Sequence, residues 1–195
     1  IFKHPGDGYY GIKREAKGSN LSATIYLLLF FIAYIYWIFE TSFLFNNYIP
    51  AEINMFQQIV TVFVPFFLFV VANYLVCSIR DGEGKLKDVY QASAYTLLPM
   101  IIAFPILTIV SKGLTYNEAF IYETLSFIAV AITVIYVVIM VKEVHFYDMK
   151  PTIGNILITL FTGIMILAVL FIVYLLLNEV YVLITDIIRE LIVRG

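Results

Sequence analysis

Six side chains that can form hydrogen bonds or ion pairs lie on the two sides of one short loop. Three precede the loop and three follow it, in each case separated by three or four residues: Asn73, Cys77 and Arg80, then Asp88, Gln91 and Tyr95. Residues three or four apart share a face of an α-helix. The spacing therefore predicts two helices whose polar faces meet and form a polar seam.

Two interpretations of this seam remain open. Hydrogen bonds between membrane helices stabilise their packing by ~1 kcal/mol each, so the seam can hold the two helices together. Alternatively, it is a partner or ligand site that opens to the cytoplasm. In either case we expect Asn73 to hydrogen-bond to Gln91 or Tyr95, Arg80 to approach Asp88, and the loop 81–87 to be exposed.

The remaining reactive side chains offer no catalytic or metal-binding pattern. His145 has no obvious serine or cysteine partner, and the HExxH, GxGxxG and GxxxxGK[ST] motifs are absent. The single cysteine, Cys77, cannot form an internal disulfide, and neither it nor His4 or His145 has a neighbour at metal-ligand spacing. We therefore expect a protein that is not an enzyme and that has no catalytic residues, no cofactor and no metal site.

Three prolines lie inside apolar stretches, at Pro65, Pro99 and Pro105. A proline inside a helix removes a backbone donor and crowds the carbonyl group four residues earlier, so these positions predict helix kinks. Kinks are common in membrane helices for packing reasons alone. Structural packing and a transport path both remain possible interpretations.

Ionisable residues inside a bilayer are expensive and usually functional. Here Glu40, Asp88 and Glu123 lie near the ends of apolar stretches, and no carboxylate or histidine lies in the middle of one. A proton-coupled transport mechanism is therefore not expected.

The composition indicates a membrane protein. Hydrophobic residues make up 62% of the chain and charged residues 13%, and the mean hydropathy is +0.94, whereas soluble domains have roughly 45–50% apolar and about 25% charged residues. The net charge of −2 gives no basic face for nucleic acid. We expect a single membrane domain that binds no DNA or RNA.

Five apolar stretches are long enough to cross a bilayer, which takes about 20 helical residues. They run over residues 21–45, 59–79, 89–110, 120–141 and 154–177. The loops 80–88 and 142–152 are short, so consecutive helices are expected to pack as antiparallel neighbours. The predicted fold is an all-α polytopic membrane bundle of five transmembrane helices.

The distribution of Lys and Arg predicts the orientation of this bundle, because cytoplasmic flanks retain cations. With five spans, nine cations fall on one side and three on the other. The nine are Lys3, Lys13, Arg14, Lys17, Arg80, Lys85, Lys87, Lys142 and Lys150, and the three are Lys112, Arg189 and Arg194. We expect the cell membrane as the location, with the N-terminus cytoplasmic and the C-terminus external.

The two ends of the chain are predicted to be amphipathic. In the segment 1–20, the apolar residues Phe2, Tyr9, Tyr10 and Ile12 alternate with four of those cations, a pattern typical of a lipid interface. In the segment 178–195, an apolar stripe faces Asp186, Arg189, Glu190 and Arg194; it consists of Val180, Ile184, Ile187, Ile188 and Leu191. We therefore divide the chain into a cytoplasmic segment 1–20, a transmembrane domain 21–177 and an external helix 178–195. Because the sequence begins with Ile1, we also expect residues before it.

Two stretches resemble a known family. HPGDGYYGIKREAKGS before the first span and RDGEGKLKDVYQASAYTLLP at the second hairpin are similar to the YIP (Ypt-interacting protein) membrane family in its bacterial branch, and residues 84–99 are the most specific part. Eukaryotic members are non-enzymatic proteins of the secretory pathway that engage small GTPases through a long cytosolic N-terminal region, where this chain has only residues 1–20. Bacterial relatives are commonly associated with sugar-uptake ABC transporters, so the resemblance implies an accessory or scaffold subunit beside transporter permeases.

Two classes of function follow. The favoured class is a non-catalytic membrane subunit whose partners are membrane lipids and other integral membrane proteins, such as permeases. The alternative is a small-molecule or lipid conduit that acts through its kinked helices. The first is preferred because an ionic midplane site and internal repeats, which many transporters have, are missing from the sequence.

Overall fold

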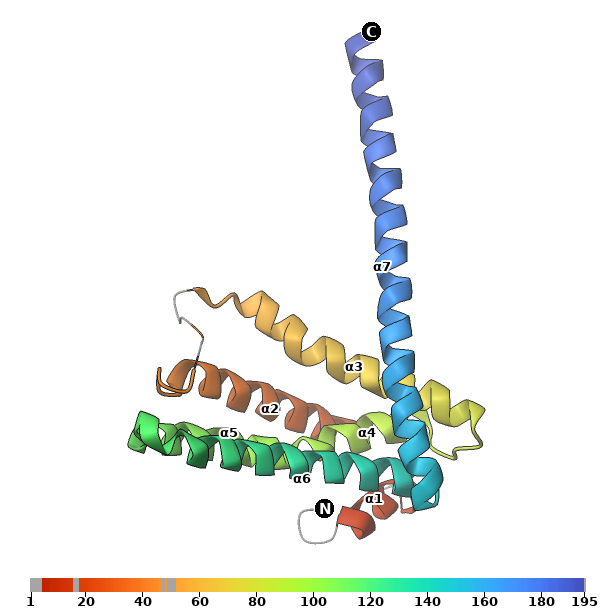
Figure 1. The fold of residues 1–195 in the computed structure, drawn as a ribbon. Helices are drawn as coiled ribbons and strands as arrows, with labels where there is room; N and C mark the ends of the chain where they lie inside the picture. The colour runs from red at the N-terminus through yellow and green to blue at the C-terminus, as the bar shows by residue number, and fades with distance from the viewer. Residues whose placement is uncertain (1–4, 16–17, 47, 49–51, 195) are drawn as a thin grey trace.

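The computed structural model describes residues 5–15, 18–46, 48 and 52–194, and of Leu191, Val193 and Arg194 it describes the backbone only. Of the residues named above, Ile1, Phe2, Lys3, His4 and Lys17 lie outside this part. The described residues form helices and connecting loops without strands: α1 Pro5–Arg14, α2 Asn20–Glu40, α3 Met55–Ile79, α4 Leu86–Thr96, α5 Leu98–Gly113, η2 Tyr116–Glu118, α6 Ala119–His145 and α7 Met149–Arg194 (Figure 1).

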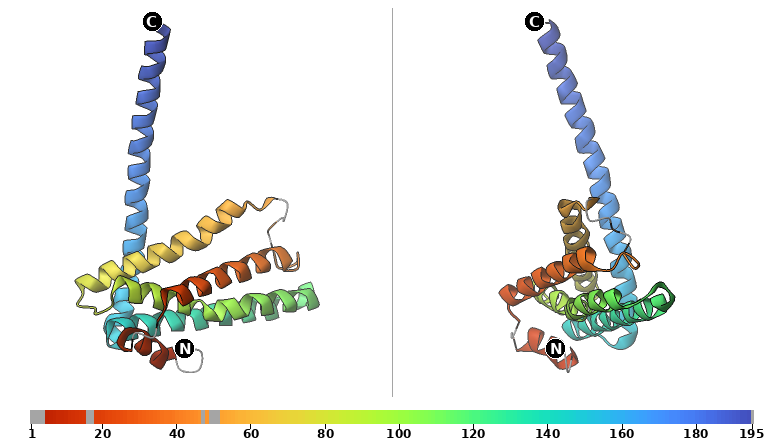
Figure 2. Two further views of the ribbon diagram at one scale, coloured as in Figure 1. Left: turned by 180° about the vertical axis from the view of Figure 1, so that it is seen from behind. Right: turned by 90° about the vertical axis from the view of Figure 1, so that its left-hand side faces the viewer.

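Five of these helical stretches are long and apolar enough to cross a membrane, which confirms the predicted fold class. They are Asn20–Glu40, Met55–Ile79, Leu86–Gly113, Tyr116–His145 and Met149–Glu190. The first four run side by side, and their connections gather at two opposite ends of the bundle (Figures 1 and 2). One end holds α1 together with the α3–α4 and α6–α7 loops.

The packing order differs from the sequence order. α2 packs mainly on α5 and α4, and α3 packs mainly on α7 and α4. Figure 1 shows α2 and α3 diverging toward their connecting loop. The expectation that consecutive helices are close neighbours is therefore wrong for this pair, because the 41–54 connection is long enough to let the two helices separate.

The three predicted kink positions have different outcomes. Pro99 lies at the first turn of α5, and the chain breaks at Leu97, whose backbone N–H donates to the carbonyl groups of Ala94 and Tyr95. The proline cannot donate to the carbonyl of Tyr95, so the break satisfies a group that Pro99 leaves free. Pro65 and Pro105 instead lie inside α3 and α5, which continue through them.

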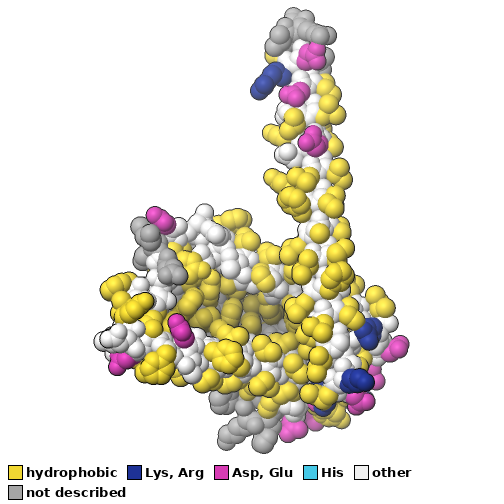
Figure 3. Space-filling model, viewed as in Figure 1, with side chains coloured by type: hydrophobic (Ala, Val, Ile, Leu, Met, Phe, Trp, Pro, Cys, Tyr) yellow, Lys and Arg dark blue, Asp and Glu magenta, His cyan; other side chains and the backbone are white. Residues whose placement is uncertain are grey.

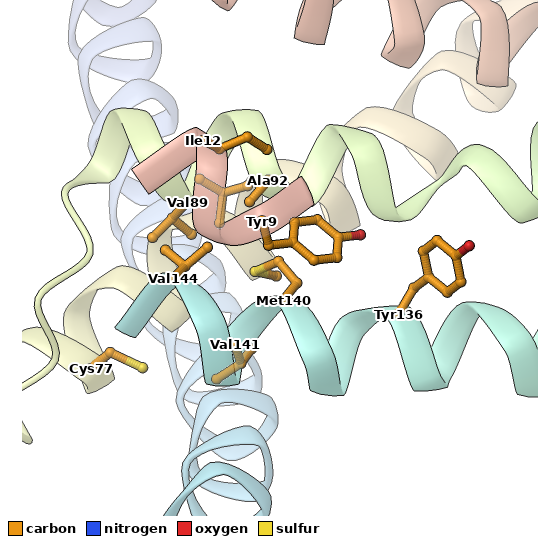
Figure 4. Close-up of a cluster of buried hydrophobic side chains, with 10 residues drawn as sticks. Tyr9, Ile12, Cys77, Val89, Ala92, Tyr136, Met140, Val141 and Val144 are labelled. Atoms are coloured by element: carbon orange, nitrogen blue, oxygen red, sulfur yellow. The ribbon is translucent and has the colours of Figure 1, made fainter. Parts of the chain in front are cut away.

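One cluster of buried hydrophobic side chains lies at the end of the bundle that holds α1. Its residues come mainly from α1, α4 and α6, and include Tyr9, Val89, Met140 and Val144. Figure 4 shows Ile12 and Ala92 close to Val89, with the Tyr9 ring extending along α6 toward Tyr136. This core fixes α1 against two of the transmembrane helices.

The last helix leaves the bundle. α7 packs on α3 near its start, where the Gly163 backbone is close to Leu68, and then extends away from the other helices (Figures 1 and 2). The segment 178–195 therefore begins inside a helix that continues unbroken from Met149. All described side chains from Leu167 to Ile192 are exposed.

Candidate functional site

The candidate site is the end of the bundle where α1, the α3–α4 loop and the α6–α7 loop meet, and it is called the junction below. At its centre Asn73 of α3 is fully buried and connects two other helices. Its Oδ1 atom lies 3.1 Å from Nε2 of His145 at the end of α6, and its Nδ2 atom donates to Oγ1 of Thr159 in α7 at 3.4 Å. One amide thus joins α3, α6 and α7.

The α3–α4 loop folds over this buried histidine. Asp81 adopts the left-handed conformation with φ of 59°, and the Gly82 N–H donates to the carbonyl of Cys77 at 2.7 Å. A Cβ atom on Gly82 would lie 2.7 Å from Nδ1 of His145, and one on Gly84 would lie 2.7 Å from its Cε1. Both glycines are therefore needed for the loop to approach the imidazole so closely.

Tyr147 also contacts the start of this loop, through its hydroxyl group. Its hydroxyl group contacts the carbonyl oxygens of Cys77 at 3.1 Å and Arg80 at 2.9 Å, and its ring stacks on His145 with the centroids 5.7 Å apart. Burial raises the pKa of the Tyr147 hydroxyl, and the neighbouring Cys77 raises it further. The phenol therefore stays protonated and remains a hydrogen-bond donor to the loop.

The helix α1 closes the junction with its cations. Lys13 forms an ion pair of 3.3 Å with Asp88, and the two side chains are only 11% and 17% exposed. Lys13 also donates to the backbone carbonyl of Glu83. Arg14 lies over the ring of Phe146, 4.4 Å from its centroid, a cation–π contact. Asp88 accepts in addition from the N–H of Lys85 at the start of α4.

The predicted seam is thus divided among different partners. Gln91 donates to Oδ1 of Asn20 at 2.5 Å, and Tyr95 packs edge-on against Tyr26 with the ring centroids 5.1 Å apart. Among the described contacts there is no bond between Asn73 and Gln91 or Tyr95, so that expectation is wrong. The physical reason is that α4 turns this polar face toward α2, whereas α3 turns Asn73 toward α6 and α7.

The expected approach of Arg80 to Asp88 is likewise not found among the described contacts. The carboxylate of Asp88 pairs with Lys13, and Arg80 contributes its backbone carbonyl to Tyr147. The loop itself is mixed: Asp81, Lys85 and Lys87 are exposed, whereas Gly84 is buried. Asp81 and Lys85 therefore remain accessible to a partner at this surface.

Several residues of the junction were not identified from the sequence. The closest contacts of the junction are made by Gly82, Gly84, His145 and Tyr147, none of which belongs to the predicted polar seam. A further signal was the spacing of Thr152, Asn155 and Thr159 on α7, which are all buried. Both polar atoms of the Asn155 side chain are buried without a hydrogen-bond partner among the described residues.

The hydrogen bonds and the ion pair of the junction position α1 and the two loops relative to the transmembrane helices. The thiol of Cys77 is buried, and the described residues contain no group of three or more His, Cys, Asp or Glu side chains that could hold a metal ion. What the junction supplies is an ordered surface made from α1 and two loops. Lys13 and Tyr147 form hydrogen bonds to the α3–α4 loop of this surface, and the imidazole of His145 lies against the same loop.

Comparison with known proteins gives one result. A family model described as the Yip1 domain matches residues 1–177, which is most of the chain. No curated protein and no solved structure gives a significant match. The matched region covers the junction and all five spans up to a point within α7.

Proposed function

Since the chain belongs to the Yip1 domain family, we propose that this membrane protein is a non-catalytic accessory or scaffold subunit of a larger membrane assembly. In this proposal α7 binds other integral membrane proteins, and the junction presents a fixed surface to them. The observation that carries the proposal is the exposed length of α7.

The length of α7 exceeds what a membrane crossing requires. Its 46 residues correspond to roughly 69 Å at 1.5 Å per residue, whereas the hydrocarbon core of a bilayer is about 30 Å thick. More than half of the helix is therefore available beyond a single crossing. The part of α7 from Leu167 onward, whose described side chains are all exposed, is suited to packing on another protein.

The character of the exposed part supports protein contacts. Val180, Ile184 and Ile188 are each about half exposed and lie on one face, with Asp186 and Arg189 on the other. An apolar stripe on a helix is normally buried against a partner or an interface. We expect this stripe to pack on a helix of the partner subunit.

The partner class follows from the family resemblance. We propose that the partner is a permease subunit of an ABC transporter for carbohydrate uptake, as the bacterial branch implies. Permeases are themselves polytopic helical proteins, and packing between helices would cover the exposed part of α7 beyond Leu167.

Site-specific photocrosslinking in intact cells tests the proposal. A photoreactive amino acid replaces Leu175 in α7, and the matched control carries it at Ile109 in α5, which is also exposed. We expect the Leu175 position to crosslink to a permease subunit, identified by mass spectrometry, and the Ile109 position to crosslink to lipid.

Two results would contradict the proposal. Crosslinking at Leu175 to lipid alone would mean that α7 crosses the membrane without a protein partner. Crosslinking to a second copy of the same chain would indicate a homo-oligomer instead of an accessory subunit.

A further inference from the structure

A cavity of about 380 Å³ lies within the membrane-spanning part of the molecule, between α2, α3, α4, α5 and α6. Its walls are nearly all apolar and include Leu27, Phe30, Phe66 and Val137. It lies beside Pro65 and beside Leu97, where α4 ends. The divergence of α2 and α3 described above leaves this space between the helices.

A second cavity of about 400 Å³ adjoins the first. It extends toward Met100 and Ile156, and the two cavities share Phe69, Thr133 and Val137 as lining residues. Figure 3 shows the molecule hollowed between α3 and the layer of helices beneath it, with hydrophobic side chains on the walls. The hollow is therefore reached from the side of the bundle, which in a membrane is the bilayer.

The volume of the cavity and its apolar walls indicate which class of ligand it can bind. An apolar cavity of about 150 Å³ stays free of water and takes up benzene, and small-molecule sites measure roughly 300–1,000 Å³. A space of about 380 Å³ with apolar walls is therefore large enough for part of an acyl chain. The surrounding bilayer supplies acyl chains at very high concentration.

One polar group in the wall is left without a partner. Ser93 is 2% exposed and lines the cavity, yet its Oγ atom has no hydrogen-bond partner among the described residues. Two threonines in the same wall do have hydrogen-bond partners. Thr96 donates to the carbonyl of Ser93 at 2.6 Å, and Thr133 donates to the carbonyl of Ala129 at 2.9 Å. A buried hydroxyl without a partner destabilises the fold, so Ser93 indicates a ligand that accepts a hydrogen bond.

The position of Ser93 along α4 indicates which chemical group of a ligand would accept this hydrogen bond. It lies seven residues after Leu86, the start of α4, which corresponds to roughly 10 Å along the helix. This is one to two turns below the end of the bundle, close to the level where the fatty ester groups of a glycerolipid join its chains. We propose that the cavity binds one acyl chain of a membrane glycerolipid, whose ester carbonyl accepts a hydrogen bond from Ser93.

The far end of the cavity provides a reporter for this binding. Tyr34 and Phe104 line it there, and the ring of Trp37 packs against Phe104 with the centroids 5.4 Å apart. Trp37 is the single tryptophan of the chain. A brominated acyl chain in the cavity would therefore quench the fluorescence of Trp37.

The test uses the full chain in detergent micelles, titrated with phosphatidylcholine that carries brominated acyl chains. A zwitterionic lipid avoids simple attraction to the basic loops. We expect saturable quenching of Trp37. Thr133→Phe, which fills the cavity, should weaken binding by roughly tenfold or more, and Ser93→Ala should weaken it roughly threefold to tenfold, as expected for one hydrogen bond.

Thr124→Phe is the matched control. Thr124 lies on the same helix as Thr133 and likewise donates to the carbonyl four residues earlier, but it is exposed. This variant should bind as the wild type does, and helical circular dichroism of all variants establishes that they fold.

Three results would overturn the inference. The first is quenching that rises linearly with lipid, as for contact with the bulk micelle. The second is equal weakening by Thr133→Phe and Thr124→Phe. The third is saturable quenching by a brominated free fatty acid but not by the phosphatidylcholine, which would remove the ester from the proposed contact.

Discussion

Single side chains determine which helices contact one another at the junction, and Asn73 hydrogen-bonds to two other helices. Its amide contacts His145 at the end of α6 and Thr159 in α7, which follow Asn73 by 72 and 86 residues along the chain. Nδ1 of His145 has no partner among the described residues, so the bond to Asn73 is the one hydrogen bond of that imidazole within this part of the chain. Loss of the amide would leave the ring without it.

The variant Asn73→Leu therefore has a cost that a surface substitution would not have. It removes both hydrogen bonds and leaves buried polar groups of His145 and Thr159 unsatisfied, which costs about 1–3 kcal/mol per group. We expect a lower midpoint for thermal unfolding in detergent. Thr159→Val, which removes only the long 3.4 Å bond, should cost less. Equal unfolding midpoints for Asn73→Leu and the wild type would contradict this role.

The same residue shows what a sequence pattern determines. Spacing of three and four residues predicts a shared helix face for Asn73, Cys77 and Arg80, and of these Asn73 and Cys77 are buried whereas Arg80 is exposed. The pattern contains no information about which helix covers the face. Here α7 returns to α3 across a separation of 86 residues, so the partner of Asn73 was not predictable from the hairpin alone.

At the scale of elements, α1 is a helix that packs on protein. Tyr9 and Ile12 are 0% and 5% exposed, whereas Tyr10 is 45% exposed. Burial raises the pKa of the Tyr9 hydroxyl far above its usual range, with a smaller contribution from Tyr136, so Tyr9 is neutral in its apolar site. The alternation of aromatic and basic residues predicted an interface helix, but it cannot distinguish a lipid interface from a protein surface.

Replacement of the buried tyrosine should release this element. Tyr9→Ala removes a fully buried aromatic ring, a change that costs about 3–5 kcal/mol in typical cores. Because α1 is short and terminal, the loss should appear as local unfolding. Hydrogen exchange followed by mass spectrometry should show faster exchange in residues 5–15, and Tyr10→Ala should have a much smaller effect. Similar exchange in both variants would mean that the Tyr9 contacts do not hold α1.

The break between α4 and α5 is a second case at this scale. Apolar length alone predicted one span over residues 89–110, and a single span is found over Leu86–Gly113. Pro99 was identified as a kink, but the rule for helix interiors does not say whether a helix bends or ends. The backbone N–H of Leu97 reaches the carbonyls of Ala94 and Tyr95, and that local contact converts a bend into two helices.

For the whole molecule, the number of spans followed from hydrophobic length, whereas the course of α7 did not. Runs of about 20 apolar residues are required by the bilayer thickness, so five stretches predicted five spans. The direction of α7 depends on a few contacts near its start, such as Gly163 with Leu68. Such contacts leave no periodic signal in the sequence, and beyond its packing on α3 and α6 the helix α7 extends away from the other spans (Figure 1).

The two ends of the bundle at which the loops lie determine which residues should be accessible from each side of the membrane. Lys85 and Lys142 lie at the end of the bundle that holds α1, and Asn46 and Tyr116 follow the opposite ends of α2 and α5. Cations favour the cytoplasmic side, so the end with α1 should face the cytoplasm. At the other end of the first four spans the one described Lys or Arg is Lys112 in the last turn of α5, and its charge is balanced by an ion pair with Glu40 at 2.6 Å.

Cysteine labelling in intact cells tests this orientation. Single cysteines are introduced at these four positions in a Cys77→Ala background, and the unmodified chain serves as a control because Cys77 is buried. A membrane-impermeant maleimide should label the cysteines at Asn46 and Tyr116 in intact cells, and those at Lys85 and Lys142 only after the membrane is permeabilised. Labelling of the Lys85 position in intact cells, with protection of the Asn46 position, would reverse the orientation and place the junction outside the cell.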